Sequence, residues 1–246
     1  MSVGRPYERE RDLAAVTRVW REVGWIDHDD EDDALALDEF LSATATLVAD
    51  VHGEAECAVS RSVGSIRHLD TDVRLCVIAA VTTGHAGRRQ GLASALVRET
   101  LLAGAADGAA VAALGMFDQG FYDRFGFGTC GYEHRSTFDP SDLDVPVPRQ
   151  APVRLTTDDA AEMHELMVRR HRGHGSVVVD PVDEFRAELR WTEKPFALGY
   201  RADDGRLTSF VQGSAKDEYG PYEVEWMAYE TPDDLLALRS ATRPVR

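Results

Sequence analysis

One stretch of the sequence decides the fold: Arg74 to Ala93, which reads R-L-C-V-I-A-A-V-T-T-G-H-A-G-R-R-Q-G-L-A. Its first half, Arg74 to Thr83, is a nearly continuous apolar run that is too short to span a membrane and predicts a buried strand. Gly84 ends this run, and apolar residues from Leu92 onward recur at helical spacing. The stretch therefore predicts a strand, a loop and a helix in immediate succession.

The loop between this strand and this helix has the chemistry of an anion site. A helix start leaves about four backbone N–H groups without partners, and the helix dipole adds partial positive charge there. Gly91 has no Cβ, so a ligand can approach the backbone closely. Arg88 and Arg89 add two permanent cations. Together these features predict a pyrophosphate-binding site.

Two motifs point to a known family. The hexapeptide Arg88–Ala93, R-R-Q-G-L-A, resembles the (Arg/Gln)-x-x-Gly-x-(Gly/Ala) signature of the GNAT acetyltransferases. It is not a Walker loop, because no Gly-Lys-Ser/Thr follows, and it is not the three-glycine Rossmann pattern. A second stretch, Gly120–Gly128 (G-F-Y-D-R-F-G-F-G), resembles the GNAT segment in which a tyrosine follows the fifth strand, and it is most similar to the enhanced-intracellular-survival (Eis) family. Within it, Phe125 and Phe127 are expected to be core residues.

This resemblance implies an α/β (α+β) architecture: a GNAT fold with a mixed, splayed central sheet flanked by helices, followed by a second, incomplete GNAT-like lobe. The sequence around the motif predicts a strand at 3–7, a helix at 8–24, a second short helix that closes at 38–42, strands at 44–51, 56–67 and 109–116, and a last strand at 129–138. In a GNAT fold the strand at 109–116 splays from the central strand, so that pantetheine can lie between them like an added strand.

The domain boundary is expected in a proline-rich linker at 139–152, which holds four prolines in fourteen residues and can form neither a helix nor a central strand. We therefore predict a catalytic GNAT acetyltransferase domain at 1–138 and a second GNAT-like lobe at 153–246. The sequence of that lobe predicts a strand at 153–156, helices at 160–172 and 181–191, strands at 196–202, 207–215 and 222–229, and a last helix from 231. This order repeats the first half of a GNAT fold.

The second lobe departs from the family in two respects. It has no Arg-x-x-Gly-x-Ala loop, so it is expected to bind no coenzyme A. The sterol-carrier-like domain that ends Eis proteins has no counterpart in this sequence. The role of the Eis terminal carboxylate as catalytic base is therefore not carried over to Arg246.

The composition is strongly acidic, with 43 Asp and Glu against 27 Lys and Arg and a net charge of −16. Such a chain is a poor partner for nucleic acid, whose phosphates need a cationic surface. Lys194 and Lys216 are the only lysines. Few lysines with many Asp, Arg and Ala indicate a salt-adapted, halophilic-like proteome. The alternative is an ordinary acidic protein whose charge only confers solubility.

The cysteines and histidines indicate which cellular compartment and which cofactors to expect. Cys57, Cys76 and Cys130 form no Cys-x-x-Cys pair, which is typical of a reducing cytoplasm. No apolar leader and no run of membrane-spanning length are present, so a soluble cytoplasmic protein without membrane partners is expected. His164, His171 and His174 do not match His-Glu-x-x-His, and no metal is expected.

The resemblance implies an acetyl-CoA-dependent N-acetyltransferase. Acetyl-CoA is the co-substrate, and its acetyl group passes directly to a primary amine of a small cationic molecule or of a lysine side chain. The resemblance implies that backbone N–H groups of Val81, Thr82 and Thr83 bind the acetyl carbonyl and pantetheine. It also implies that the pyrophosphate is bound by Arg88, Arg89, Gly91 and Ala93. Tyr122 is the implied general acid. The alternative is a noncatalytic GNAT-fold module that binds coenzyme A or assembles into an oligomer. Eis-type proteins form rings, and a homo-oligomer is a further expectation.

The sequence leaves alternatives for the residues that bind the amine acceptor and for the catalytic base. Residues 25–33, W-I-D-H-D-D-E-D-D, read either as a solvated acidic loop or as an acidic rim that attracts a cationic amine. In the second interpretation Asp27, Asp29 and Asp30 bind the acceptor. The base stays open between His85, Asp118 and Glu133.

Overall fold

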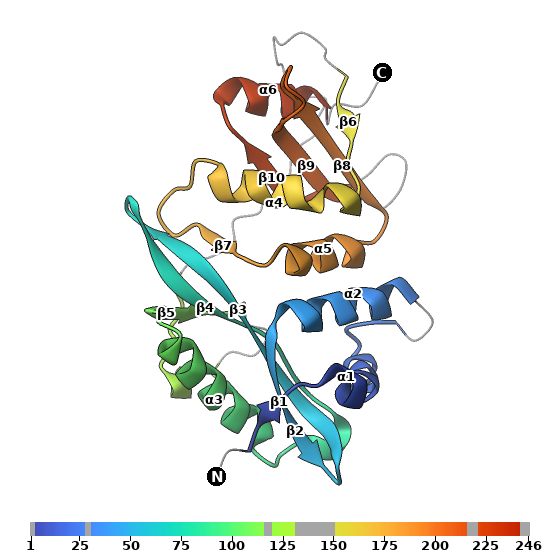
Figure 1. Cartoon of the computed structure of the whole chain (residues 1–246), viewed down its shortest axis with the longest axis vertical. Helices are drawn as coiled ribbons and strands as arrows, with labels where there is room; N and C mark the ends of the chain where they lie inside the picture. The colour runs from blue at the N-terminus through green and yellow to red at the C-terminus, as the bar shows by residue number, and fades with distance from the viewer. Residues whose placement is uncertain (1–2, 28–30, 116–119, 131–150, 216–220, 242–246) are drawn as a thin grey trace. The chain divides into compact units, whose positions relative to one another are not determined.

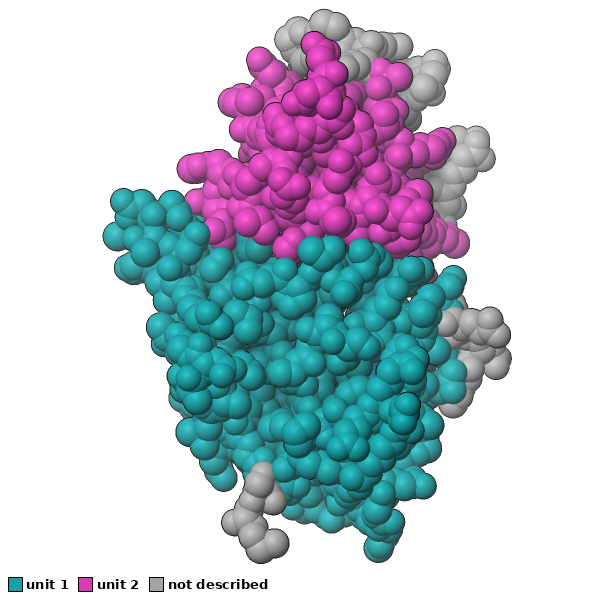
Figure 2. Space-filling view, viewed as in Figure 1, with its two compact units in different colours: residues 1–129, 173–191 teal, residues 130–172, 192–246 magenta. Residues whose placement is uncertain are grey.

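The computed structural model describes residues 3–27, 31–115, 120–130, 151–215 and 221–241. The chain forms two compact units, one of residues 1–129 and 173–191 and one of residues 130–172 and 192–246 (Figure 2). This division differs from the predicted boundary in the linker at 139–152. Residues 173–191 were expected in the second lobe, but they belong to the first unit.

The first unit is built on one sheet with helices on both faces (Figure 1). Its helices are α1 (Arg9–Glu22), α2 (Glu31–Ala43), α3 (Leu92–Ala106) and α5 (Val182–Trp191). Its strands are β1 (Arg5–Pro6), β2 (Ala45–Val51), β3 (Glu54–His68), β4 (Thr71–Thr83), β5 (Val111–Ala113) and β7 (Val177–Val179). Short 3₁₀ turns occur at His85–Gly87 and Asp123–Phe125.

The strand order in this sheet is β1-β2-β3-β4-β5. The first three pairings are antiparallel, whereas β4 and β5 run parallel. The sheet is therefore mixed, as predicted. β7 adds an antiparallel pairing to β3 at Gly64–Ile66, beyond the point where β2 has ended its pairing at Arg61. This pairing and the packing of α5 on α2 place residues 173–191 in the first unit.

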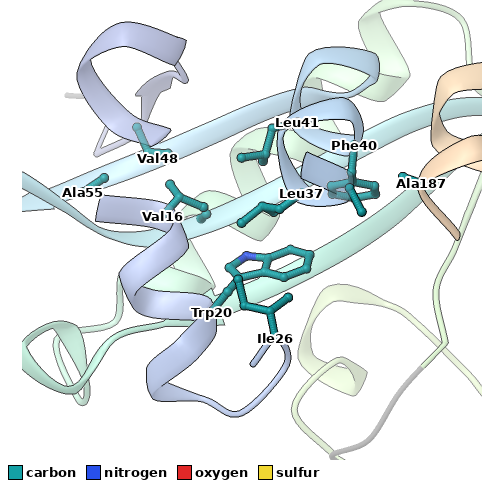
Figure 3. Packing of buried hydrophobic residues seen from close by; sticks show 11 residues of the cluster. Val16, Trp20, Ile26, Leu37, Phe40, Leu41, Val48, Ala55 and Ala187 are labelled. Carbon is teal, nitrogen blue, oxygen red and sulfur yellow. The ribbon is translucent and has the colours of Figure 1, made fainter. Parts of the chain in front are cut away.

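The two faces of the sheet carry separate cores, because successive strand residues point to opposite faces. On β3, Ala58 packs with α1 and α2, whereas Cys57 and Val59 pack with α3. The first core is centred on Trp20, which stacks on Trp191 of α5 with ring centroids 5.6 Å apart. The members labelled in Figure 3 come from α1, α2, α5, β2, β3 and the segment after α1: Val16, Trp20, Ile26, Leu37, Phe40, Leu41, Val48, Ala55 and Ala187.

Two predicted elements can be compared with the structure in their bounds. The helix that residues 38–42 were predicted to close is α2, which ends at Ala43 and begins at Glu31. Acidic residues such as those at 31–33 are favoured in a first helical turn. The strand predicted at 109–116 is shortened to Val111–Ala113. The strand predicted at 129–138 and the linker at 139–152 fall almost entirely outside the described residues, so both stay predictions.

The second unit contains an antiparallel sheet in the order β10-β9-β8-β6. Its elements are β6 (Val153–Arg154), a 3₁₀ turn (Thr157–Asp159), α4 (Ala160–Arg169), β8 (Pro195–Arg201), β9 (Leu207–Ala215), β10 (Tyr222–Tyr229) and α6 (Pro232–Ala241). Tyr200, Val211 and Leu238 form a buried cluster between the strands and α6. On β10, Tyr222, Val224 and Met227 are 43–47% exposed.

Cys57 and Cys76 are buried free cysteines of the first unit. Burial raises the pKa of the Cys57 thiol to about 11 and also raises the pKa of Cys76, so both thiols are unreactive near neutral pH. Across the described ranges, no helix combines the length and the apolar character that a membrane crossing needs. The same ranges hold no group of three or more His, Cys, Asp or Glu side chains placed to bind a metal ion.

α5 carries a buried carboxyl group, that of Glu184, whose ionisation allows a test of how this helix packs on β3. Glu184 is 8% exposed and accepts a hydrogen bond from the Ser62 hydroxyl on β3. Burial raises the pKa of Glu184, and the Ser62 hydrogen bond opposes that rise only in part. The folded state thus favours the protonated carboxyl, and this stabilisation is lost as the pH rises through the raised pKa.

We therefore expect Glu184→Gln to match the wild type in thermal stability near pH 4 and to melt about 2–4 °C higher at pH 8, because glutamine keeps the acceptor for Ser62 without a charge. Thermal melts across this pH range measure the effect. A variant that melts lower than the wild type at pH 8 would show that the ionised carboxylate is favourably paired.

Candidate active site

The centre of β4 contains a break in its pairing with β3. The register shifts between the pairs Ala58–Thr82 and Ser60–Ala79, so that Ala80 and Val81 stand opposite Val59 alone. Ala80 adopts a left-handed conformation with φ of 50°. Such a bulge redirects the backbone and is common beside active sites. Here Ala79 and Ala80 pack toward the α1–α2 core, and Val81 packs toward the α3 core.

The other edge of β4 has a short pairing with β5. Among the described residues β5 pairs with β4 only through Leu75–Val77, so residues 78–83 have a strand neighbour in β3 alone. This short pairing is compatible with the expected splay between the two strands, which stays a prediction. An unpaired strand edge can accept an extended ligand through backbone hydrogen bonds. Val81, Thr82 and Thr83, predicted to bind the acetyl and pantetheine groups, lie on this segment.

The side chains of these threonines are already placed within the fold. Thr82 is 3% exposed, and its hydroxyl has no hydrogen-bond partner among the described residues. The Thr83 hydroxyl lies 3.3 Å from the Cys57 sulfur. We therefore expect the backbone of these residues, rather than their hydroxyls, to contact a ligand at this edge.

The loop that follows has three positions that depend on glycine or on a strained backbone. Gly84 is buried and donates its N–H to the Glu56 carbonyl at 2.8 Å, and a Cβ there would collide with the Glu56 carboxylate. Gly91 has φ of 77°, a conformation that side chains rarely adopt. Apart from its chain neighbours, no described residue has an atom within 4 Å of its ideal Cβ position. Arg89 also has a positive φ, of 63°.

The start of α3 directly follows this loop. Gly91 is the N-cap residue, and no side chain caps the helix and no acidic residue stands in its first turn. Arg88 and Arg89 are exposed and form no ion pair within the described part of the chain. Predicted binding residues Arg88, Arg89, Gly91 and Ala93 are thus brought together at a helix N-terminus, which is suited to an anion.

Tyr122 lies beside this region through a shared core. Val81, Leu92, Ala93 and Tyr122 all pack, partly buried, against the cluster beneath α3. The Tyr122 ring makes edge-to-face contacts with Phe121 at 4.9 Å and Phe127 at 5.9 Å. The predicted core positions Phe125 and Phe127 pack against the same cluster.

The acceptor residues and bases predicted from the sequence are only partly placed. Asp27 is exposed, and its N–H donates to the Asp33 carboxylate at 2.8 Å. Asp29, Asp30, Asp118 and Glu133 lie outside the described residues and stay predictions. His85 is exposed at the loop, where its ring nitrogen Nδ1 lies 3.5 Å from the Glu22 carboxylate.

Three charged residues at the loop were missed by sequence reasoning: Arg18, Glu22 and Glu56. Arg18 donates to Glu22 at 2.7 Å and to Glu56 at 2.6 Å. The i, i+4 spacing of Arg18 and Glu22 on one helix could have indicated that pair. Nothing in the sequence indicates Glu56, because its position depends on the pairing of β3 with β4.

The fold and this arrangement agree with a known protein family. Residues 7–130 match the acetyltransferase (GNAT) domain family, and this match covers about half of the chain. The chain therefore belongs to the GNAT acetyltransferase family, as the motifs predicted. Among curated proteins, none matches the sequence.

Solved structures resemble this chain over nearly its whole length. An Enterococcus faecalis V583 protein described as a probable N-acyltransferase superposes with a TM-score of 0.71 at 17% identity, and a GCN5-related N-acetyltransferase from Kribbella flavida with 0.70 at 24%. Eis1 from Mycobacterium abscessus superposes with 0.67 at 18% identity. Each match covers 96% of this chain but only 60–61% of the other protein. At these identities the likeness establishes the fold alone. The proteins that share this fold include an Eis protein.

Proposed function

We propose that the protein is an acetyl-CoA-dependent N-acetyltransferase that moves an acetyl group to a primary amine of a small cationic molecule or of a lysine side chain. The observation that carries this proposal is the edge of β4 at residues 78–83, which β5 leaves unpaired within the described part of the chain and which leads directly into the Gly91 loop and the start of α3, where no side chain caps the helix. In a GNAT domain such an edge and loop suit the pantetheine and pyrophosphate of the coenzyme.

The proposed coenzyme site uses the backbone of Val81, Thr82 and Thr83 for the acetyl carbonyl and pantetheine. Arg88, Arg89, Gly91 and Ala93 hold the pyrophosphate. Each N–H that faces the carbonyl oxygen stabilises the charge that develops there during attack. The site contributes mostly by orienting the two substrates.

The reaction is a direct attack in a ternary complex. The neutral amine nitrogen forms a bond to the acetyl carbon, the carbon–sulfur bond breaks, and the amine loses a proton to a base. The leaving thiolate, whose conjugate thiol has a pKa of about 8.5, takes a proton from the phenol of Tyr122. For the base, His85, Asp118 and Glu133 stay as candidates.

An acidic acceptor side fits a cationic amine. Asp27 stands with Asp29 and Asp30 in the segment between α1 and α2, and we propose that their negative charge raises the local concentration of the acceptor. A homo-oligomer is a further proposal, supported by the exposed apolar side chains of β10.

The arginine pair provides a prediction about binding. We expect Arg88→Ala/Arg89→Ala to raise the Kd of acetyl-CoA about tenfold or more, because two charge-assisted contacts to the pyrophosphate are lost. Isothermal titration calorimetry measures the Kd. Arg98→Ala is the matched control, since Arg98 is an exposed arginine on α3 beyond its first turn. Equal affinities in all three proteins would remove the arginine pair from the site.

The experiment that tests the function measures release of free thiol from acetyl-CoA, with a panel of amines in high potassium chloride. Amine-dependent release is the expected result. Tight acetyl-CoA binding without release for any amine would favour the alternative, a noncatalytic module that binds coenzyme A. Absence of binding would overturn the coenzyme site itself.

A further inference from the structure

Arg18 and Glu22 of α1 and Glu56 of β3 form a charged group at the loop that starts with Gly84, and we refer to these three residues as the acidic bracket. Arg18 lies between the two carboxylates, with contacts of 2.7 Å to Glu22 and 2.6 Å to Glu56. The Glu56 side chain is 6% exposed, whereas Arg18 is 38% exposed. Arg18 also lies 3.5 Å from the exposed carboxylate of Glu54. One guanidinium therefore serves the two close carboxylates of the bracket and a more distant third, and the bracket has a net negative charge.

The bracket also holds the backbone of the loop. The Glu22 carboxylate accepts the N–H of His85 at 2.9 Å, and the Glu56 carbonyl accepts the N–H of Gly84 at 2.8 Å. The hydrogen bond from His85 is the main cause that lowers the pKa of Glu22. Gly87 packs over the Glu56 main chain so closely that an added Cβ would lie 3.1 Å from its carbonyl oxygen. The first residues of the loop are thus fixed from α1 and from β3.

The charge of the bracket conflicts with the anion that the loop is suited to bind. Two carboxylates near a pyrophosphate site repel the ligand unless they are neutralised. Glu56 is also costly in itself, because one of its carboxylate oxygens is buried without a hydrogen-bond partner among the described residues. Arg18 is the cation that offsets both effects. It is not itself on the loop, which separates its role from that of Arg88 and Arg89.

We propose that Arg18, Glu22 and Glu56 are positioning residues of the coenzyme site, in which the carboxylates fix the loop and Arg18 neutralises them so that the anionic part of acetyl-CoA can bind. This inference rests on the proposed function. It assigns to α1 a part in coenzyme binding through the loop, without direct contact with the coenzyme.

The first test compares two acetyl donors in the variant Arg18→Ala. We expect the Kd of acetyl-CoA to rise about tenfold with kcat at saturation within about twofold, since the added negative charge acts on binding. S-acetylpantetheine lacks the pyrophosphate, and its KM is expected to change less than about twofold. Arg18→Lys keeps the charge and is expected to recover most of the affinity. Arg9→Ala, which breaks the exposed Arg9–Asp38 pair at the other end of α1, is the control.

A second set of variants separates charge from misfolding. Glu22→Gln keeps an acceptor for the His85 N–H but removes a negative charge, so we expect acetyl-CoA to bind about twofold to threefold more tightly. Combining Arg18→Ala with Glu22→Gln and Glu56→Gln is expected to restore affinity to within about threefold of the wild type. Glu22→Gln tests the inference even if Arg18→Ala fails to fold.

Different outcomes separate the inference from the proposed function. A wild-type protein that binds no acetyl-CoA overturns both. If the wild type binds and Arg18→Ala binds equally well, only the inference fails. It also fails if Arg18→Ala weakens both donors to the same extent, or if Glu22→Gln leaves the Kd of acetyl-CoA unchanged or raises it.

Discussion

Tyr122→Phe is expected to lower kcat about 100-fold while the Kd of acetyl-CoA stays within about twofold of the wild type. Loss of a positioned general acid typically costs a factor of this size or more. Phenylalanine keeps the edge-to-face contacts with Phe121 and Phe127, which involve the ring and not the hydroxyl. The change therefore removes the proposed proton donor and leaves the aromatic packing in place.

The measurement is the steady-state rate of thiol release at saturating acetyl-CoA and amine, with the Kd determined separately by calorimetry. Tyr229→Phe in the second unit is the matched control, since it makes the same chemical change outside the GNAT domain. An unchanged kcat in Tyr122→Phe would remove Tyr122 from the mechanism and leave the transfer reaction intact. A higher Kd with unchanged kcat would instead assign Tyr122 to coenzyme binding.

The features that the sequence predicted well are those encoded within one contiguous stretch. The apolar run of β4, Gly84, Gly91 and the periodic start of α3 follow one another within Arg74–Ala93, so each depends on neighbours a few residues away. Local signals of this kind are independent of the rest of the fold. The proposed coenzyme site lies on this stretch, so its candidate residues could be named from local sequence alone.

The features that were missed depend on contacts between distant segments. The Val177–Val179 run has no pattern that indicates pairing with Gly64–Ile66, more than a hundred positions earlier. Likewise, no local signal shows that Trp191 stacks on Trp20 or that Glu56 meets Arg18. The sequence repeat in the second lobe favoured one continuous domain at 153–246, whereas tertiary pairing places residues 173–191 in the first unit.

Asp12→Ala is expected to destabilise the first unit by about 2–3 kcal/mol. This is less than the cost of removing one partner from a fully buried ion pair, because Arg5 keeps its pair with Asp50 at 2.7 Å. Asp12 is 1% exposed and binds Arg5 through two hydrogen bonds of 2.7 Å. It also accepts the N–H of Glu8, the N-cap residue of α1, at 2.8 Å. A single carboxylate thus joins β1 to the start of α1, and alanine leaves both Arg5 and this N–H without it.

The same carboxylate predicts how stability depends on acid. Burial raises the pKa of Asp12, but the hydrogen bonds from Arg5 and from the Glu8 N–H, with the charges of Arg5 and Arg11, lower it overall. A lowered pKa stabilises the fold above the unfolded value of about 3.9, and this contribution is lost as the pH falls through the lower folded value. The difference between wild type and Asp12→Ala should therefore be largest near neutral pH and shrink below about pH 4.

Urea unfolding at pH 7 and at lower pH measures this difference, with Asp38→Ala as the matched control. Asp38 pairs with Arg9 at 2.6 Å, but Arg9 is 60% exposed, so breaking that pair is expected to cost about 0.5 kcal/mol or less. Equal losses in the two variants would mean that the burial of Asp12 adds nothing to its ion pair. A loss in Asp12→Ala that persists unchanged at low pH would assign its effect to packing, because a protonated Asp12 can no longer pair with Arg5 as an ion.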